Sequence, residues 1–195
     1  MDSPSHFFAY IARMKFIQRW GVMRSTQSEN IQEHSLQAAI LAHALAVISR
    51  DQFGGDVDPE RVMALAVFHD VSEVITGDLP SPIKHHDPDL SSAYGRIEVA
   101  ARERLTAMLP EDLRPTYRPL LFGQDRPEHL RLVKAADKLC SYLKCLEELK
   151  SGNEEFTHAR SAIEREIQAL ELPEVAWFIE HFVPSFSLTL DELNS

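Results

Sequence analysis

The sequence predicts an all-α fold of about six to eight helices, organised as one domain over residues 1–195. Apolar residues recur at spacings of three and four along most of the chain, which is typical of amphipathic helices. Prolines and glycines gather between these stretches, and no alternating strand pattern, repeat or low-complexity tract interrupts them. A chain of this length can bury roughly 70% of its unfolded surface around one core.

The apolar periodicity and its terminators predict helices at about residues 7–20, 30–49, 58–76, 91–108, 128–150, 154–170 and 174–182. Asn30 and Glu33 have the spacing of a capping box, and Asp58-Pro59 has the residue types that begin a helix. Two prolines predict a rigid loop at 78–82, and the proline-marked region 110–127 is assigned no helix.

Composition limits the partners and the compartment. A net charge of −10 and a pI near 5.3 argue against a nucleic-acid polymer or an anionic membrane. A small anionic substrate remains possible, because a local cation can override the global field. Cys140 and Cys145 are interpreted as core residues in a reducing compartment. Because the N-terminus lacks a secretory pattern, a cytoplasmic protein is expected.

One stretch, 66–73, carries a group of ionisable residues on an otherwise apolar predicted helix. Glu73 follows Asp70 by three residues and His69 by four, so a helix would place all three in one groove. Burying such groups costs several kcal/mol unless they are paired or bind a metal. A solvent-facing stripe is the alternative interpretation.

Two further residues are candidate metal ligands. His34 lies in the first turn of the second predicted helix, where a capping or core role is the alternative. Asp137 interrupts the apolar stripe of a long helix, where a buried Asp is either paired with Lys or Arg or bound to a metal. His43 lies half a helical turn away from His34, so the two cannot face one ion. The sequence has no Gly-rich phosphate loop, G-x-S-x-G, H-E-x-x-H or paired C-x-x-C motif, which leaves metal chemistry.

The order His34, His69-Asp70, Asp137 resembles that of the HD-domain metal-dependent phosphohydrolases. Other segments resemble the bacterial 5′-deoxynucleotidases, namely Arg19-Trp20, Glu33-His34-Ser35, His69 to Glu73, Gly77 to Pro82 and Tyr142 to Glu148. The resemblance implies an HD-domain helical bundle that acts as a homodimer. It also implies an enzyme that removes the 5′-phosphate from deoxyribonucleoside 5′-monophosphates.

By the same resemblance, one divalent cation is bound by His34, His69, Asp70 and Asp137. This donor set suits Co²⁺, Mn²⁺, Zn²⁺ or Fe²⁺ without choosing among them. The implied substrate-binding residues are Arg19, Trp20, His34, Asp70, Asp78, Leu79, Pro80, Ser81 and Asp137. Arg19 would clamp the phosphate with its planar fork of donors. Trp20 would exclude a 2′-hydroxyl by its bulk.

Glu73, Asp78 and Arg19 are the expected catalytic residues. A divalent cation can lower the pKa of a bound water towards about 7 and neutralise phosphate charge. One of the two carboxylates then handles the water and the other the leaving O5′, with Glu73 favoured for the water. Two other functions stay open. An HD hydrolase could act on a nucleoside triphosphate, guanosine tetraphosphate or a cyclic phosphodiester, or the chain could be a non-catalytic nucleotide-binding regulator.

Overall fold

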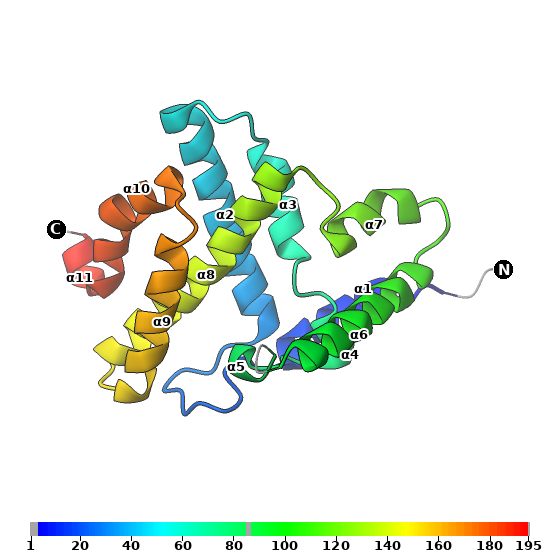
Figure 1. Ribbon diagram of the computed structural model, residues 1–195, viewed down its shortest axis with the longest axis horizontal. Coiled ribbons are helices and arrows are strands. Elements are labelled where there is room, and N and C mark those ends of the chain that lie inside the picture. The colour runs from blue at the N-terminus through cyan, green and yellow to red at the C-terminus, as the bar shows by residue number, and fades with distance from the viewer. Residues whose placement is uncertain (1–3, 85–86, 195) are drawn as a thin grey trace. The chain divides into compact units, whose positions relative to one another are not determined.

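The computed structural model describes residues 4–84 and 87–194, and the regular secondary structure of these residues is helical (Figure 1). An isolated bridge between Gln18 and Asn30 is the single extended pairing in the described ranges. This confirms the all-α prediction. The helices are α1 (Phe7–Ile11), α2 (Ile31–Phe53), α3 (Pro59–Val67), α4 (Glu73–Thr76), α5 (Ser81–Lys84), α6 (Pro88–Ala107), α7 (Arg114–Phe122), α8 (Pro127–Lys150), α9 (Thr157–Gln168), α10 (Pro173–Phe182) and α11 (Leu190–Leu193), with short 3₁₀ helices η1 (Ala12–Phe16), η2 (Glu154–Phe156) and η3 (Val183–Ser187). None of the described helices has the length and apolar character needed to cross a membrane.

The contacts divide the chain into two compact units. The first contains Met1–Met23, Ser28–Leu36 and Val67–Asp125. In this unit α6 packs against α1, α4, α5 and α7. Its core consists of five side chains that are at most 2% exposed, namely Phe7, Val71, Leu105, Leu109 and Leu121. Because Val71 follows Asp70 directly, burial of its side chain in this core holds the backbone that carries Asp70.

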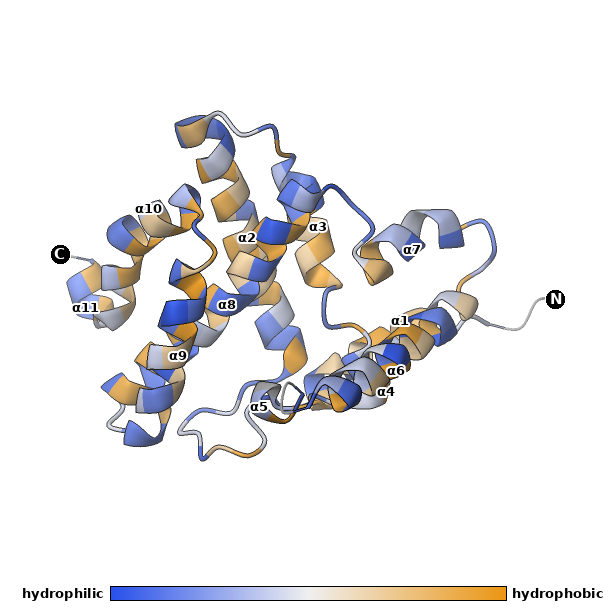
Figure 2. Ribbon diagram, viewed as in Figure 1, coloured by the Kyte–Doolittle hydropathy of each residue, from blue (hydrophilic) through white to orange (hydrophobic). Residues whose placement is uncertain are grey.

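The second unit contains Arg24–Gln27, Gln37–Ala66 and Arg126–Ser195, with α8 packed against α9 and η3. Orange and blue positions alternate around α8 in Figure 2, as expected of an amphipathic helix. Cys140 and Cys145 are buried, free thiols on this helix. Glu148, also on α8, is 1% exposed and accepts hydrogen bonds of 2.8 Å from both the N–H and the hydroxyl of Thr26. The buried Glu148 carboxylate therefore holds the connector around Thr26 against α8.

The predicted beginnings of two helices are confirmed. Asn30 Oδ1 accepts hydrogen bonds from the N–H groups of Gln32 and Glu33, at 3.0 and 3.1 Å, and Glu33 Oε2 accepts from Asn30 N–H at 3.2 Å. This is a reciprocal capping box at the start of α2. Asp58 caps α3 by accepting from Arg61 N–H at 3.0 Å. Helix α2 continues to Phe53, past the predicted end near Ser49, and stops before Gly54 at a φ of +69°.

The prediction of one helix from Phe7 to about Trp20 is wrong beyond Phe16. The chain tightens into η1 and then extends, with Ile17 at φ −95° and ψ 111°. Arg19 N–H donates to the carbonyl of Glu29 at 2.8 Å, and Ile31 N–H donates to the carbonyl of Ile17 at 3.0 Å. These backbone hydrogen bonds between residues 17–19 and 29–31 replace helical ones and bring Arg19 alongside Glu29.

The prediction of one helix through 58–76 is also wrong, because α3 ends at Val67 and residues 68–72 form turns. Val71 N–H donates to Phe68 at 3.2 Å and Glu73 N–H to Asp70 at 2.9 Å, both in the i to i+3 pattern of a tighter turn. The chain re-enters a helix only at α4. His69 and Asp70 therefore lie on a turn between two helices instead of on one helix face.

The proline-rich stretches contain helices that the sequence pattern did not predict. Residues 77–80 form the expected loop, but α5 begins at Ser81 with Pro82 as its second residue. Proline is tolerated there because the first N–H groups of a helix have no partner within it. Helix α7 likewise begins just before Pro115 and contains Pro119 inside.

Candidate metal centre

Three nitrogen and oxygen atoms converge in the first unit. His34 Nε2 lies 3.2 Å from His69 Nε2 and 3.3 Å from Asp70 Oδ2, and His69 Nε2 lies 3.2 Å from the same oxygen. His34 is fully buried, and the side chains of His69 and Asp70 are 14% and 24% exposed. The capping box fixes the first turn of α2 and therefore His34, while the turn 68–72 carries the other two.

These distances fit a shared cation. Ligand bonds of about 2.0–2.2 Å, typical of imidazole nitrogen and carboxylate oxygen on zinc, separate neighbouring ligand atoms by about 2.8–3.6 Å for angles at the metal between a right angle and a tetrahedral one. The triangle of 3.2, 3.2 and 3.3 Å falls within this range. Two imidazole nitrogens and a carboxylate oxygen within 4.8 Å of one another make a donor set that a divalent ion can join. Burial would raise the pKa of Asp70, but the charges and hydrogen bonds of His69 and His34 outweigh it and hold that pKa well below its ordinary value.

The two predicted acid–base carboxylates border this triangle. Burial, together with the negative charges of Asp70 and Asp78, raises the pKa of Glu73 to about 9, although Arg19 and His69 act in the opposite direction. Glu73 Oε2 is buried without a hydrogen-bond partner among the described residues. Burial also raises the pKa of Asp78, with Arg19 opposing and Asp70 reinforcing the shift. Carboxyl groups whose pKa is raised in this way by burial and neighbouring charges are typical of catalytic sites.

Arg19 and Trp20 lie beside the same carboxylates. The Arg19 side chain is 13% exposed, and its Nη1 lies 3.6 Å from Glu29 Oε2. Trp20 has a φ of +61°, a left-handed conformation that costs a non-glycine residue about 1–2 kcal/mol. Its backbone N–H bonds the Asp78 carboxylate, and its indole Nε1–H donates to Glu29 Oε2 at 2.8 Å. A strained backbone held by this many polar contacts is characteristic of functional sites.

The loop 77–80 is anchored from α6. Tyr94 Oη lies 3.1 Å from the Gly77 carbonyl and 3.2 Å from Thr76 Oγ1, and Gly77 has a φ of +73° that side chains rarely adopt. Leu79 and Pro80 are half-buried beyond Asp78. Ser81 begins α5, and its side chain lies outside the described part of the structure. The loop thus presents Asp78 from a fixed backbone.

Asp137 stays a prediction as a ligand. It is half-buried on α8, between the fully buried Ala136 and the half-buried Lys138, and α8 belongs to the second unit. His43 is half-buried on α2. His129 is 4% exposed in α8, and its Nε2 accepts a hydrogen bond from Asp58 N–H at 3.1 Å. His85 and His86 lie outside the described residues.

Glu29 is the residue that sequence analysis missed. It lies in a polar connector, where a single glutamate carries no periodicity or motif signal. The backbone pairing of Ile17 to Arg19 with Glu29 to Ile31 brings its carboxylate to the site. Its Oε1 lies 4.0 Å from His34 Nδ1.

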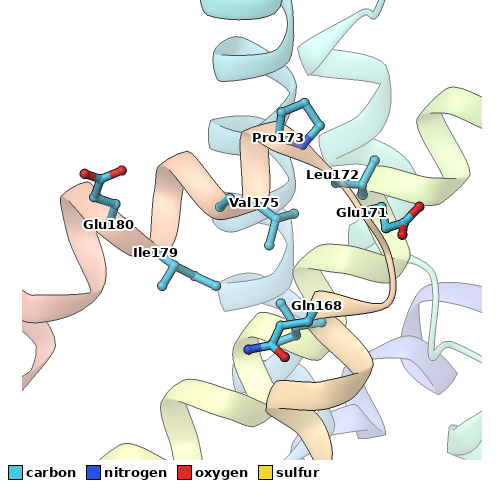
Figure 3. A pocket seen from close by; sticks show the side chains of 9 residues that line it. Gln168, Glu171, Leu172, Pro173, Val175, Ile179 and Glu180 are labelled. Atoms are coloured by element: carbon cyan, nitrogen blue, oxygen red, sulfur yellow. The ribbon is translucent and has the colours of Figure 1, made fainter.

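A separate hollow of about 560 Å³ lies in the second unit, along α9 and α10 (Figure 3). Its walls are mainly aliphatic, with Val175 and Ile179 on one side and Leu172 at the turn before α10. It has no histidine or cysteine in its lining and contains two carboxylates, Glu171 and Glu180. It therefore lacks the donor set found around His34.

The fold is shared with HD-domain phosphohydrolases. A crystal structure of an HD-domain phosphohydrolase from Listeria innocua superposes with a TM-score of 0.82 over 97% of this chain and 92% of the other, at 22% identity. The cyanophage S-2L HD phosphohydrolase DatZ, determined with dA and one catalytic Zn²⁺ ion, superposes with a TM-score of 0.66 over 91% of this chain and 96% of the other, at 20% identity. The chain therefore has the fold of the HD-domain phosphohydrolases, and the donor triangle lies within this fold.

The sequence identifies a narrower group. Residues 6–186 match the family described as YfbR-like 5′-deoxynucleotidases. A 5′-deoxynucleotidase of Vibrio cholerae is 53% identical over 97% of this chain and 98% of its own length. A 5′-deoxynucleotidase of Yersinia pestis is 50% identical over 97% of both chains. This chain belongs to the YfbR-like 5′-deoxynucleotidase family.

Proposed function

We propose that this protein is a 5′-deoxynucleotidase, which hydrolyses deoxyribonucleoside 5′-monophosphates to deoxynucleosides and phosphate. Membership of the family over residues 6–186 supports the reaction. The observation that carries the proposal is the convergence of three ligand atoms at 3.2–3.3 Å beside two carboxyl groups of raised pKa. A nucleotide-binding regulator without catalytic activity would not need these buried ionisable groups, whose burial costs several kcal/mol unless they are paired or bind a metal.

One divalent cation is the proposed cofactor, held by His34, His69 and Asp70 with Asp137 as the fourth ligand. When bound, it lowers the pKa of a water and neutralises phosphate charge. The donor set suits Co²⁺, Mn²⁺, Zn²⁺ and Fe²⁺, and the Zn²⁺ of the cyanophage protein makes zinc the first metal to assay.

Two carboxyl groups are proposed to move protons. Glu73 accepts the proton of the attacking water, as a carboxylate that a divalent cation bound beside it would keep ionised against the effect of burial. Asp78, whose pKa is also raised, carries a proton to O5′ of the leaving deoxynucleoside. Without that proton the leaving group would be an alkoxide, which departs slowly. No covalent intermediate is required.

Arg19 and Trp20 are proposed to bind the nucleotide. The Arg19 guanidinium pairs with the 5′-phosphate, for which its planar donors are suited. Trp20 packs beside the sugar and excludes a 2′-hydroxyl. Asp78, Leu79, Pro80 and Ser81 line the sugar and phosphate, and His34, Asp70 and Asp137 border the phosphate as ligands.

The assembly and compartment are part of the same proposal. Residues 1–195 act as a single HD-type domain. Leu36 and Ile40, one turn apart on α2, are 63% and 60% exposed, and pairing with a second copy would cover them in a homodimer. Two buried free thiols, Cys140 and Cys145, suit the reducing cytoplasm. Sedimentation of the purified protein tests the dimer directly.

A substrate panel tests the proposal. Phosphate release is measured for the five deoxyribonucleoside monophosphates and for AMP, GMP, CMP and UMP, with wild type and Trp20→Ala. The proposal predicts that wild type prefers every deoxyribonucleotide over its ribonucleotide and that Trp20→Ala narrows this preference. Equal hydrolysis of dAMP and AMP by wild type would overturn it, as would faster hydrolysis of dATP or a cyclic phosphodiester.

A further inference from the structure

The Glu29 carboxylate contacts three side chains with proposed functions. Oε2 accepts the indole Nε1–H of Trp20 at 2.8 Å and lies 3.6 Å from Arg19 Nη1. Oε1 lies 4.0 Å from His34 Nδ1. The Glu29 side chain is only 11% exposed, so its charge is directed into the site and away from solvent. The Trp20 contact is the shortest of the three.

Discrimination by bulk requires the blocking ring to stay in place. A 2′-hydroxyl differs from hydrogen by a single oxygen atom, so a ring that can rotate away leaves room for it. A tryptophan side chain has two torsions and one polar group, the indole Nε1–H. A neighbour that accepts a hydrogen bond from this group restrains both torsions. In this protein that atom is bonded to Glu29, and the Arg19 guanidinium lies 5.9 Å from the centroid of the same ring.

The backbone of Trp20 is held separately from its ring. Its N–H bonds Asp78, its carbonyl accepts from Met23 N–H at 2.8 Å, and the preceding N–H, of Arg19, bonds the Glu29 carbonyl at 2.8 Å. All of these involve main-chain atoms on at least one side and do not use the Glu29 carboxylate. Replacing the Glu29 side chain therefore removes the acceptor of the indole N–H and leaves the backbone pairing of residues 17–19 with 29–31.

We propose that Glu29 is a positioning residue for substrate specificity, which fixes the Trp20 indole in the orientation that excludes a 2′-hydroxyl. The inference rests on the proposed function, because it assigns to Glu29 a part in the sugar discrimination ascribed to Trp20. Glu29 touches no reacting atom. Its effect is therefore on the ratio of kcat/KM for dAMP to kcat/KM for AMP, more than on turnover of dAMP.

The test compares Glu29→Ala with Glu29→Gln. Alanine removes the acceptor, so the dAMP-to-AMP ratio is expected to fall about tenfold, the effect of one hydrogen bond to a charged group. Glutamine keeps an amide oxygen at the same place and is expected to restore most of the ratio. Glu33→Gln is the matched control. It removes one negative charge four residues away, while a glutamine can still complete the capping box of α2.

A double-mutant cycle with Trp20→Phe shows whether Glu29 acts through the indole. Phenylalanine keeps a ring but has no N–H, so Glu29→Ala should lower the ratio no further in that background. A fall of the same size in both backgrounds would overturn the inference, because Glu29 would then act through Arg19 or His34. An unchanged ratio in Glu29→Ala with wild-type Trp20 would overturn it as well.

Fluorescence gives a readout that does not depend on activity. The chain has two tryptophans, so Trp177→Phe leaves Trp20 as the sole tryptophan, whose emission is excited selectively at wavelengths that tyrosine does not absorb. In that background Glu29→Ala should increase quenching of Trp20 by acrylamide, and Glu29→Gln should not. Identical quenching in all three proteins would overturn the inference.

The outcomes separate the two proposals. A wild type that hydrolyses dAMP and AMP equally would overturn the proposed sugar specificity, and the inference with it. A wild type that discriminates, beside a Glu29→Ala variant that discriminates equally well, would overturn the inference alone.

Discussion

Glu73→Gln should make the metal-free protein more stable and the enzyme slower. The substitution keeps the shape of the side chain and removes its ability to ionise. Glu73 is flanked by Asp70 and Asp78 and has one buried oxygen with no hydrogen-bond partner among the described residues. Folding at neutral pH therefore either buries an unfavourable charge or takes up a proton.

The size of the effect follows from the pKa of Glu73, which the fold raises from 4.5 to about 9. A raised carboxyl pKa means that the folded state binds more protons than the unfolded state between these values. The Glu73 carboxyl therefore favours the folded state most below pH 4.5, and this contribution to the free energy of unfolding is lost as the pH rises towards 9. About 2.5 pH units separate 4.5 from neutrality, and each unit corresponds to about 1.36 kcal/mol. The upper limit at pH 7 is thus about 3 kcal/mol, and partial exposure reduces the expected gain to about 1–2 kcal/mol.

Urea unfolding of both proteins in a chelator, at pH 4, 7 and 8.5, measures this gain. The free energy of unfolding of Glu73→Gln relative to wild type should rise from pH 4 to pH 8.5. The same variant should hydrolyse dAMP about 10²–10⁴-fold more slowly with metal, as expected when a positioned acid–base group is lost. A difference in stability that does not change with pH would refute the assignment of Glu73 as a buried, destabilised carboxyl.

Three further predictions concern the ligands and the core. Asp70→Ala should lose metal and activity together, whereas Glu73→Ala should keep its metal and lose only activity; metal analysis and circular dichroism of both variants separate a ligand from a bordering residue. Asp137→Asn should lower the affinity of the protein for its metal at least tenfold, and unchanged affinity would remove Asp137 from the ligand set. Phe7→Ala should cost about 3–5 kcal/mol of stability, because the ring is fully buried and packs edge-on against Tyr117 at a centroid distance of 5.4 Å. A loss below about 1 kcal/mol in urea unfolding would contradict the placement of Phe7 in the core.

Local chemistry accounts for the parts of the fold that the sequence predicted well. The capping box of Asn30 and Glu33 and the Asp58 cap depend on neighbouring residues, and both helices begin where these predict. The break at 68–72 was missed because the residues are compatible with a helix. Burial of Val71 in the core of the first unit and the convergence of His69 with His34 favour a turn instead. Tertiary contacts of this kind override local propensity and leave no periodic signal.

The candidate site was predictable as a set of residue types and less so as a geometry. His34, His69 and Asp70 converge as expected, although the helical spacing used to group His69 with Glu73 does not exist in the structure. Glu29 could not be found, because its role depends on the pairing of two segments that are both irregular. The periodicity of neighbouring residues carries no information about a contact between two segments that the fold brings together.

Metal titration into the chelated protein tests the central claim most directly. Zn²⁺, Co²⁺, Mn²⁺ and Fe²⁺ are added separately while dAMP hydrolysis and bound metal per chain are measured on the same samples. The account predicts no turnover without metal, and activity that rises in proportion to binding up to one ion per chain. Full turnover of dAMP in metal-free protein, or two tightly bound ions per chain at full activity, would contradict it.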